Sequence, residues 1–395
     1  MNKASSRILS VIVIAQFFCT SLWFAGNAVL PDLVSFLKIS DTALGHITAA
    51  VQFGFITGTL FYATLLIADR FPASRVFFLS AVMAALSNLC IVFINPSLAS
   101  LMSMRFLTGF FLAGIYPVGM KIAADHFENG LGKALGFLVG ALVAGTAFPH
   151  LLKSFTTALP WKNVLYFTSD LSIAGGVLML LVPEGPYQKR LQAIDYKAMF
   201  SIFKNKQFRT AAFGYFGHMW ELYAFWAFVP FALTTYKNMH DPADINISAI
   251  TFSIIASGAV ACVISGYLSQ IFGAKRTAFT TLLLSGCCCI LSPLAFYLPL
   301  IPFVIFLIFW GLVVIADSPL FSTLVAQNAI LQVKGTAITI VTCIGFTITI
   351  ISIELLNYIS RQINGRFIFM LLALGPLAGL IYMKSQKKKD ALIEN

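Results

Sequence analysis

The sequence predicts an all-α membrane protein, and two observations carry that prediction. Of its 395 residues, 59% are hydrophobic and only 10% are charged, whereas a soluble domain has about 25% charged residues with which to cover a water-facing surface. In addition, apolar stretches of about 20 residues, the length of a membrane-spanning helix, recur along the whole chain. A helix satisfies its own backbone groups in hydrocarbon, so we expect these stretches to be transmembrane helices.

Twelve apolar segments are long enough to span a bilayer. They run over residues 8–30, 43–67, 75–94, 98–122, 134–157, 162–182, 209–236, 248–271, 277–297, 301–322, 335–358 and 365–384. The only long polar connection, residues 184–208, follows the sixth segment and divides the twelve into six and six. We therefore expect an N-terminal half over 1–183, a linker over 184–208, and a C-terminal half with a basic tail over 209–395.

The charge distribution indicates how the chain is oriented. A net charge of +11 is compatible with nucleic-acid binding, but the basic residues concentrate in alternate connections, which is the pattern of the positive-inside rule. With the N-terminus inside, eighteen Lys and Arg residues fall on the inner side and about six on the outer side. We expect both termini in the cytoplasm, a multi-pass protein of the cell inner (plasma) membrane, and no nucleic-acid partner.

An internal repeat relates the two halves. The stretch LLIADRFPASRV after the second segment aligns with GYLSQIFGAKRT after the eighth at a constant shift of 201 residues, which pairs Phe71 with Phe272 and Arg75 with Arg276. Internal repeats of this kind are typical of secondary transporters, which hold their substrate near the bilayer midplane between the repeats. The repeat therefore favours a transporter with two related halves.

The first of these stretches resembles the G-x-L-x-D-R-x-G-R-R loop of the major facilitator superfamily (MFS). Asp69 and Arg70 fit that pattern, whereas Leu65 and Pro72 stand where its glycines are usual. The resemblance covers nearly the whole chain and implies the MFS fold. It also implies a gating latch between the halves, in which Asp69 docks at the start of the eleventh helix, near Lys334. The residues assigned to gating are Asp69, Arg70, Arg75, Gly266, Gly273, Lys275 and Arg276.

Five charged or titratable residues are the candidates that we place in the interiors of the apolar segments, away from their ends. They are Arg105, Asp170, His218, Glu221 and Asp317. A charge in hydrocarbon costs at least roughly 2.5–3.5 kcal/mol, so such residues usually face a bundle interior or a wet cavity. His218 and Glu221 lie three positions apart on one helix face, so we expect them to meet. Asp170 is a candidate partner for Arg105, and Pro319 interrupts the helix beside Asp317.

Each of these groups also has a purely structural interpretation. The His218–Glu221 and Arg105–Asp170 pairs could only lock helices together, and Asp317 could be a buried acid bound by Ser318. The resemblance favours function, because helices one, four, seven and ten line the central cavity of MFS proteins. Arg105 also matches the R-x-x-x-G signature of the fourth helix. The candidate substrate- and proton-binding residues are therefore Arg105, His218, Glu221, Asp317, Trp220, Tyr223, Trp226, Asn27, Trp23 and Asp170.

The function expected is secondary active transport by alternating access, coupled to protons, of a small polar or anionic organic solute such as a siderophore or a carboxylate. A proton-coupled multidrug or metabolite exporter is the alternative, and a membrane receptor or scramblase on the same fold is a remote one. No HExxH, GxSxG or nucleotide loop occurs, so we expect no enzyme, and the seven cysteines show no metal-ligand spacing. We expect a monomer whose partners are its solute, protons and membrane lipids, without a cofactor or a metal.

Overall fold

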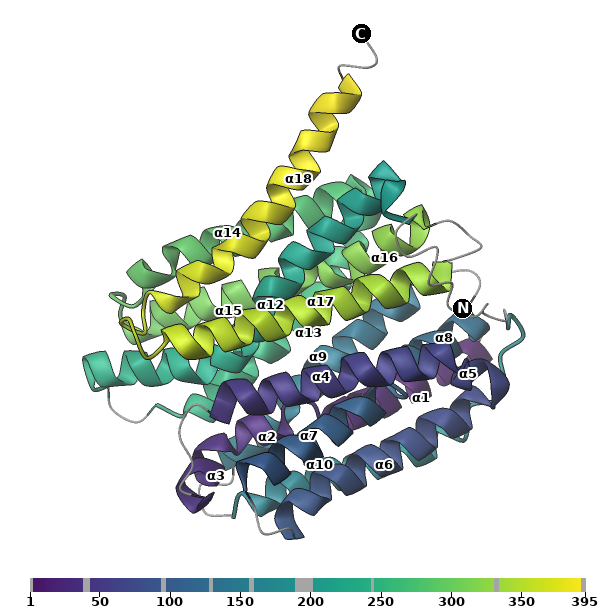
Figure 1. The fold of residues 1–395 in the computed structure, drawn as a ribbon, viewed down its shortest axis with the longest axis horizontal. Coiled ribbons are helices and arrows are strands. Elements are labelled where there is room, and N and C mark those ends of the chain that lie inside the picture. The colour runs from purple at the N-terminus through teal and green to yellow at the C-terminus, as the bar shows by residue number, and fades with distance from the viewer. Residues whose placement is uncertain are drawn as a thin grey trace. The chain divides into compact units, whose positions relative to one another are not determined.

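The computed structural model describes residues 3–37, 43–93, 97–127, 131–155, 160–188, 202–242, 245–329 and 334–391. All twelve predicted segments are helical within these ranges (Figure 1). The chain divides into two compact units, which are described separately. Unit 1 comprises residues 1–191 and 246–259, and unit 2 comprises residues 192–245 and 260–395. Residues 189–201, in the middle of the predicted linker, lie outside the described part, and the predicted boundaries of the halves stay a prediction.

Unit 1 contains the first six spans. Its helices are α1 (Lys3–Thr20), α2 (Ala25–Ala28), α3 (Leu30–Leu37), α4 (Ala43–Thr64), α5 (Ile67–Arg70), α6 (Ala73–Phe93), α7 (Leu98–Leu112), α8 (Tyr116–His126), α9 (Leu131–Phe155) and α10 (Lys162–Met179). The first span consists of α1, α2 and α3, and the fourth consists of α7 and α8. The beginning of the eighth span groups with this unit.

Unit 2 contains the remaining spans. Its elements are a short 3₁₀ helix η1 (Ile202–Lys204), then α12 (Lys206–His240), α13 (Ile247–Phe272), α14 (Ala274–Ala295), α15 (Leu300–Ala316), α16 (Ser318–Asn328), α17 (Lys334–Ile359), η3 (Ile368–Ala373) and α18 (Leu374–Ala391). The tenth span consists of α15 and α16, and the twelfth of η3 and α18. In the described part, eight spans meet the length and hydropathy expected of a membrane-crossing helix, and two further apolar helices are shorter.

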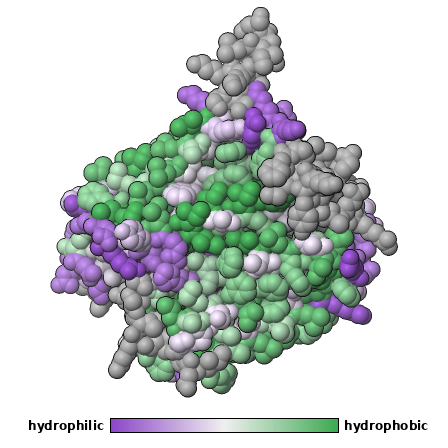
Figure 2. Space-filling model, viewed as in Figure 1, coloured by the Kyte–Doolittle hydropathy of each residue, from purple (hydrophilic) through white to green (hydrophobic). Residues whose placement is uncertain are grey.

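The exterior fits a membrane environment. Large apolar side chains are exposed on many helices, among them Phe93, Ile271 and Ile381, at 75%, 73% and 67%. Figure 2 shows hydrophobic residues over much of the visible surface, with hydrophilic residues in smaller patches. A water-soluble protein rarely exposes contiguous apolar patches above a few hundred Å². The prediction of an all-α membrane protein is confirmed.

Two spans are broken at equivalent places. Pro117 is the second residue of the 11-residue helix α8, and Pro319 is the second residue of the 11-residue helix α16. The two prolines lie 202 positions apart, close to the shift of the sequence repeat. Because proline lacks an N–H, each break frees a carbonyl four residues earlier. The carbonyl freed before Pro319 is that of Ile315, which accepts a weak hydrogen bond from the Cys262 thiol at 3.8 Å.

Close packing of α4 on α7 fixes the position of the fourth span within unit 1. A Cβ atom at Gly54 would overlap the backbone of Phe106, and one at Gly109 would overlap the backbone of Val51. Small residues at a helix interface let the two backbones approach in this way. The contact holds Arg105, one turn before Gly109, against the interior of unit 1, where its side chain is fully buried.

Candidate functional site

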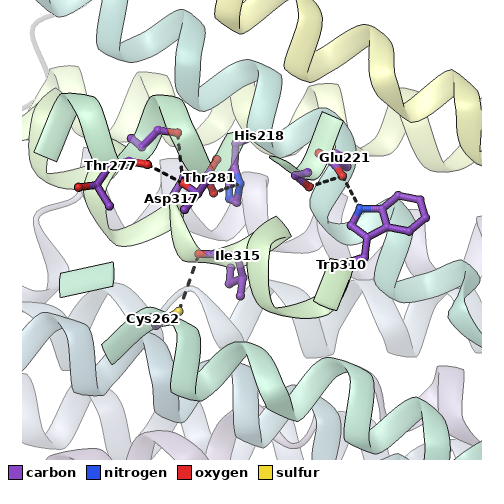
Figure 3. Close-up of polar contacts among 10 residues, drawn as sticks. His218, Glu221, Cys262, Thr277, Thr281, Trp310, Ile315 and Asp317 are labelled. Carbon is purple, nitrogen blue, oxygen red and sulfur yellow. Dashed lines mark hydrogen bonds and ion pairs between the residues drawn. The ribbon is translucent and has the colours of Figure 1, made fainter. Parts of the chain in front are cut away.

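A buried contact between a histidine and an aspartate joins the seventh span to the break in the tenth. The Nδ1 atom of His218 on α12 lies 2.7 Å from Oδ1 of Asp317, and each side chain is 1% exposed. Asp317 occupies the junction between α15 and α16 (Figure 3). The carboxylate of Asp317 therefore lies at the helix break beside Pro319 and contacts α12. The break beside Pro319 was predicted from the sequence.

Glu221 has a different set of partners. Its Oε1 atom accepts hydrogen bonds from Ser285 Oγ at 2.5 Å, Trp310 Nε1 at 2.6 Å and Cys289 Sγ at 3.2 Å. These donors lie on α14 and α15, and Glu221 is 1% exposed. Burying an acid is costly unless hydrogen bonds replace its hydration. Three donors on one oxygen supply that replacement.

The predicted contact between His218 and Glu221 is wrong. Residues three apart on a helix point about 60° away from each other, and here that difference directs the two side chains to different neighbours. His218 reaches Asp317, whereas Glu221 reaches α14 and α15 (Figure 3). The predicted site did not include Ser285, Cys289 and Trp310, because a serine, a cysteine and a tryptophan are common inside an apolar span. The sequence indicated only that a buried Glu221 would need hydrogen-bond donors from other helices.

The aromatic residues predicted on α12 separate into two roles. Tyr223 packs edge to face on Trp226, with ring centroids 5.4 Å apart, and Trp226 is fully buried. Trp220 instead donates from Nε1 to the carbonyl of Leu371 in η3, at 3.1 Å. Trp220 therefore ties the seventh span to the twelfth, while Tyr223 and Trp226 belong to the buried side of α12.

In unit 1, Arg105 caps the break in the first span. Its Nη1 donates to the carbonyl of Leu22 at 3.0 Å and its Nη2 to the carbonyl of Trp23. Both carbonyls belong to the turn between α1 and α2. Asp170 is exposed on α10, whereas Arg105 is fully buried. The predicted pairing of these two residues is therefore wrong.

The other predicted residues of the first span lie near the same break. The Trp23 and Phe55 rings have centroids 4.9 Å apart. Asn27 donates from Nδ2 to Thr48 Oγ1 at 2.7 Å. Arg105, Trp23 and Asn27 thus surround one interruption of the helix in unit 1, while His218, Glu221 and Asp317 form the titratable cluster of unit 2.

The predicted gating residues form one described ionic contact. Lys121 Nζ on α8 lies 3.5 Å from Asp69 and 2.9 Å from Asp125, which connects α5 to α8. Gly273 has φ 82°, a conformation that favours glycine, and it directly precedes α14. Five of the predicted gating residues are exposed: Arg70, Arg75, Gly273, Lys275 and Arg276. Docking of Asp69 at the start of α17 stays a prediction.

No group of His, Cys, Asp and Glu side chains within the described ranges has the arrangement needed to hold a metal ion. His218, Glu221 and Asp317 are the titratable side chains of the cluster in unit 2, and Arg105 is the buried basic side chain of unit 1.

Comparison with known proteins identifies the family. Residues 12–353 match the family model of the Major Facilitator Superfamily. Over 189 residues, the chain is 24% identical to a probable galactarate/D-glucarate transporter, GudP, of Escherichia coli K12, with 45% of this chain and 41% of that protein covered. Over 163 residues, it is 24% identical to a putative metabolite transport protein, YyaJ, of Bacillus subtilis 168, with 40% and 35% covered. The matches thus span about two fifths of these relatives.

Solved structures agree on the fold over almost the whole chain. The proton:xylose symporter XylE bound to 6-bromo-6-deoxy-D-glucose gives a TM-score of 0.76 at 12% identity. A bacterial homologue of the human lysosomal transporter Spinster, inward-facing and unoccupied, gives 0.67 at 13% identity. Each comparison covers 98% of this chain and 96% of the other. The chain belongs to the Major Facilitator Superfamily of multi-pass membrane transporters.

Proposed function

We propose that the protein is a proton-coupled, alternating-access transporter of a small organic anion, with His218, Asp317 and Glu221 as the proton-exchanging groups. The observation that carries the proposal is the buried His218–Asp317 pair at a break in the tenth span, 2.7 Å between Nδ1 and Oδ1. An imidazole changes charge near neutral pH, and ionisable groups inside a membrane protein are retained mainly for function.

Protonation changes how firmly α12 is held within unit 2. A charged Asp317 attracts His218 on α12, and a proton on the carboxylate removes that attraction. Likewise, an ionised Glu221 accepts hydrogen bonds from α14 and α15 at once, and these bonds weaken when the carboxyl group is neutral, because charge-assisted bonds are about twice as strong. Proton uptake therefore loosens α12 from its neighbours, which gives the proton a means to shift the balance between two conformations.

An anionic solute is favoured by the charge in unit 1. Arg105 is fully buried, and among side chains that the structure describes no other arginine or lysine is. The similarity to a protein named as a probable galactarate/D-glucarate transporter, over 45% of this chain, points the same way. We further propose both termini in the cytoplasm, two six-helix halves over 1–183 and 209–395, a monomer surrounded by lipid, and a location in the cell inner membrane.

The test is solute-linked proton movement in proteoliposomes that contain the purified full chain and a trapped pH-sensitive dye. Labelled D-glucarate, D-gluconate, D-xylose and tetraphenylphosphonium cover acidic, neutral and cationic solutes. We expect an acid to move with protons and to respond to an imposed pH gradient. The proposal is overturned if an acid moves at a rate that the gradient does not alter, or if only the neutral or cationic solutes move.

Three matched variants connect the result to the proposed groups. Glu221→Gln and Asp317→Asn should abolish the response to the gradient, because neither amide takes up a proton in the physiological range. Asp241→Asn makes the same change at an exposed residue just after α12 and should leave the response intact. An unaltered gradient response in both Glu221→Gln and Asp317→Asn would remove these residues from the mechanism.

A further inference from the structure

Arg105 carries a buried charge for which the described part of unit 1 offers no counterion. Its guanidinium donates only to the carbonyls of Leu22 and Trp23, and its Nε has no hydrogen-bond partner among the described residues. The described carboxylates of unit 1 are all engaged or exposed: Asp32 pairs with Lys153, Asp69 and Asp125 pair with Lys121, and Asp170 and Glu184 are exposed. A buried charge without compensation is strongly unfavourable, so a ligand anion is the expected partner.

Gln52 on α4 faces the same place. It is fully buried, and neither its Nε2 nor its Oε1 has a hydrogen-bond partner in the described structure. Residues 48, 52 and 55 share one face of a helix. The two outer members of this set face the break in the first span, since Thr48 accepts from Asn27 and Phe55 packs on Trp23. Gln52 lies between them and therefore faces the break that Arg105 caps.

Gly26 lies against the Nε side of Arg105. A Cβ atom at Gly26 would lie 3.1 Å from Arg105 Nε and 3.2 Å from its Cδ, which is closer than an ordinary contact. Beside it, Asn27 Oδ1 is buried and lacks a hydrogen-bond partner among the described residues. The break is thus surrounded by free donors, from Arg105 and Gln52, and by free acceptors, from Gln52 and Asn27.

These groups define the chemistry of a ligand. The Nε–H and the unused N–H groups of a guanidinium match a planar carboxylate. A phosphate carries about −1.5 to −2 charges at neutral pH, and unit 1 shows no second buried cation within its described residues to balance it. The free amide oxygens accept hydrogen bonds, so they suit hydroxyl groups that stand beside the carboxylate.

We propose that Arg105, Gln52 and Asn27 form a hydroxycarboxylate subsite in unit 1, in which Arg105 holds the carboxylate and the two amides hold neighbouring hydroxyls. This assignment rests on the proposed transport of an organic anion and names its substrate class. Gln52 acts as a specificity-determining residue, and the absence of a side chain at Gly26 avoids a Cβ atom 3.1 Å from Nε.

The test measures binding to the purified full chain in detergent, by the ligand-induced shift in thermal unfolding. Three probes of similar length separate the contributions: D-gluconate has a carboxylate and hydroxyls, D-sorbitol has only hydroxyls, and hexanoate has only a carboxylate. We expect D-gluconate to bind at least about tenfold more tightly than D-sorbitol, because D-sorbitol lacks the charge-assisted hydrogen bonds of the carboxylate. We also expect it to bind about tenfold more tightly than hexanoate, because hexanoate lacks the hydroxyl bonds to the two amides, each of which contributes about 1 kcal/mol. Equal binding of D-sorbitol and D-gluconate would overturn the assignment.

Variants at two neighbouring residues test the subsite while Arg105 itself is retained. Gln52→Leu should remove most of the preference for D-gluconate over hexanoate, and Gly26→Ala should weaken D-gluconate binding about tenfold or more. Gly136→Ala is the matched control, because a Cβ there meets nothing within 4 Å. Unchanged D-gluconate affinity in both Gln52→Leu and Gly26→Ala, with size-exclusion profiles like the wild type, refutes the subsite.

The binding measurement separates this inference from the proposed function. If D-gluconate binds as expected but no solute moves with protons in proteoliposomes, proton-coupled transport fails and the subsite stands. If an acid moves with protons but its binding ignores Gln52 and Gly26, the subsite fails and the proposed function stands.

Discussion

The His218–Asp317 pair allows a quantitative test of the structure that is independent of transport. Both side chains are 1% exposed and their atoms lie 2.7 Å apart. Removing one partner of a buried pair leaves an uncompensated group and costs about 3–5 kcal/mol, whereas replacing both by apolar groups is often neutral. His218→Leu and Asp317→Leu should each lower the free energy of unfolding by that amount. The double variant should lose less than either single one.

The backbone of Asp317 tolerates the change, because its φ of −85° and ψ of −16° suit leucine. The assay is reversible unfolding in mixed detergent micelles, followed by tryptophan fluorescence. Thr210→Val is the control, since that hydroxyl bonds only the carbonyl of Lys206 on its own helix. Losses below about 1 kcal/mol for the single variants, a size typical of exposed pairs, or losses that add in the double variant, would refute a buried and mutually dependent pair.

Three other substitutions test separate contacts. Trp310→Phe keeps an aromatic ring but removes the 2.6 Å hydrogen bond to Glu221, so it should lower the free energy of unfolding by about 1.5–3 kcal/mol and reduce the gradient response of uptake. Lys121→Met removes the cation that two carboxylates share and should lower the melting temperature, by less at 1 M salt because ions screen the pairs; equal shifts at both salt concentrations would contradict this. Gly54→Leu drives a side chain into the backbone of α7 and should give aggregated protein on size-exclusion chromatography, whereas Gly136→Ala, where a Cβ atom meets nothing within 4 Å, should elute normally.

The fold was predictable because its main signal is local. Each span can be identified from its own length and hydropathy, and the structure contains helices at those places. The break at Pro319 was predictable for the same reason, since a missing N–H acts within one turn. The repeat found in two loops extends to the equivalent breaks at Pro117 and Pro319.

The partners inside the candidate site were not predictable from local spacing. His218 and Glu221 suggested a pair because they are neighbours on one helix, yet Glu221 bonds residues 64 and 89 positions away. The predicted pairing of Asp170 with Arg105 was wrong for a related reason. A span that is apolar all round has no amphipathic pattern to show which face is buried, so the depth of Asp170 was predictable and its exposed orientation was not. Long-range packing determines both the partners of Glu221 and the orientation of Asp170.

The most direct test of the central proposal compares two rates for one transported acid in the same proteoliposomes. One rate is solute exchange without a gradient, and the other is proton movement that accompanies net solute flux. We expect the Glu221→Gln/Asp317→Asn double variant to retain exchange and to lose solute-linked proton movement. Proton movement at the wild-type ratio to solute in that variant would contradict the assignment of the proton to this cluster.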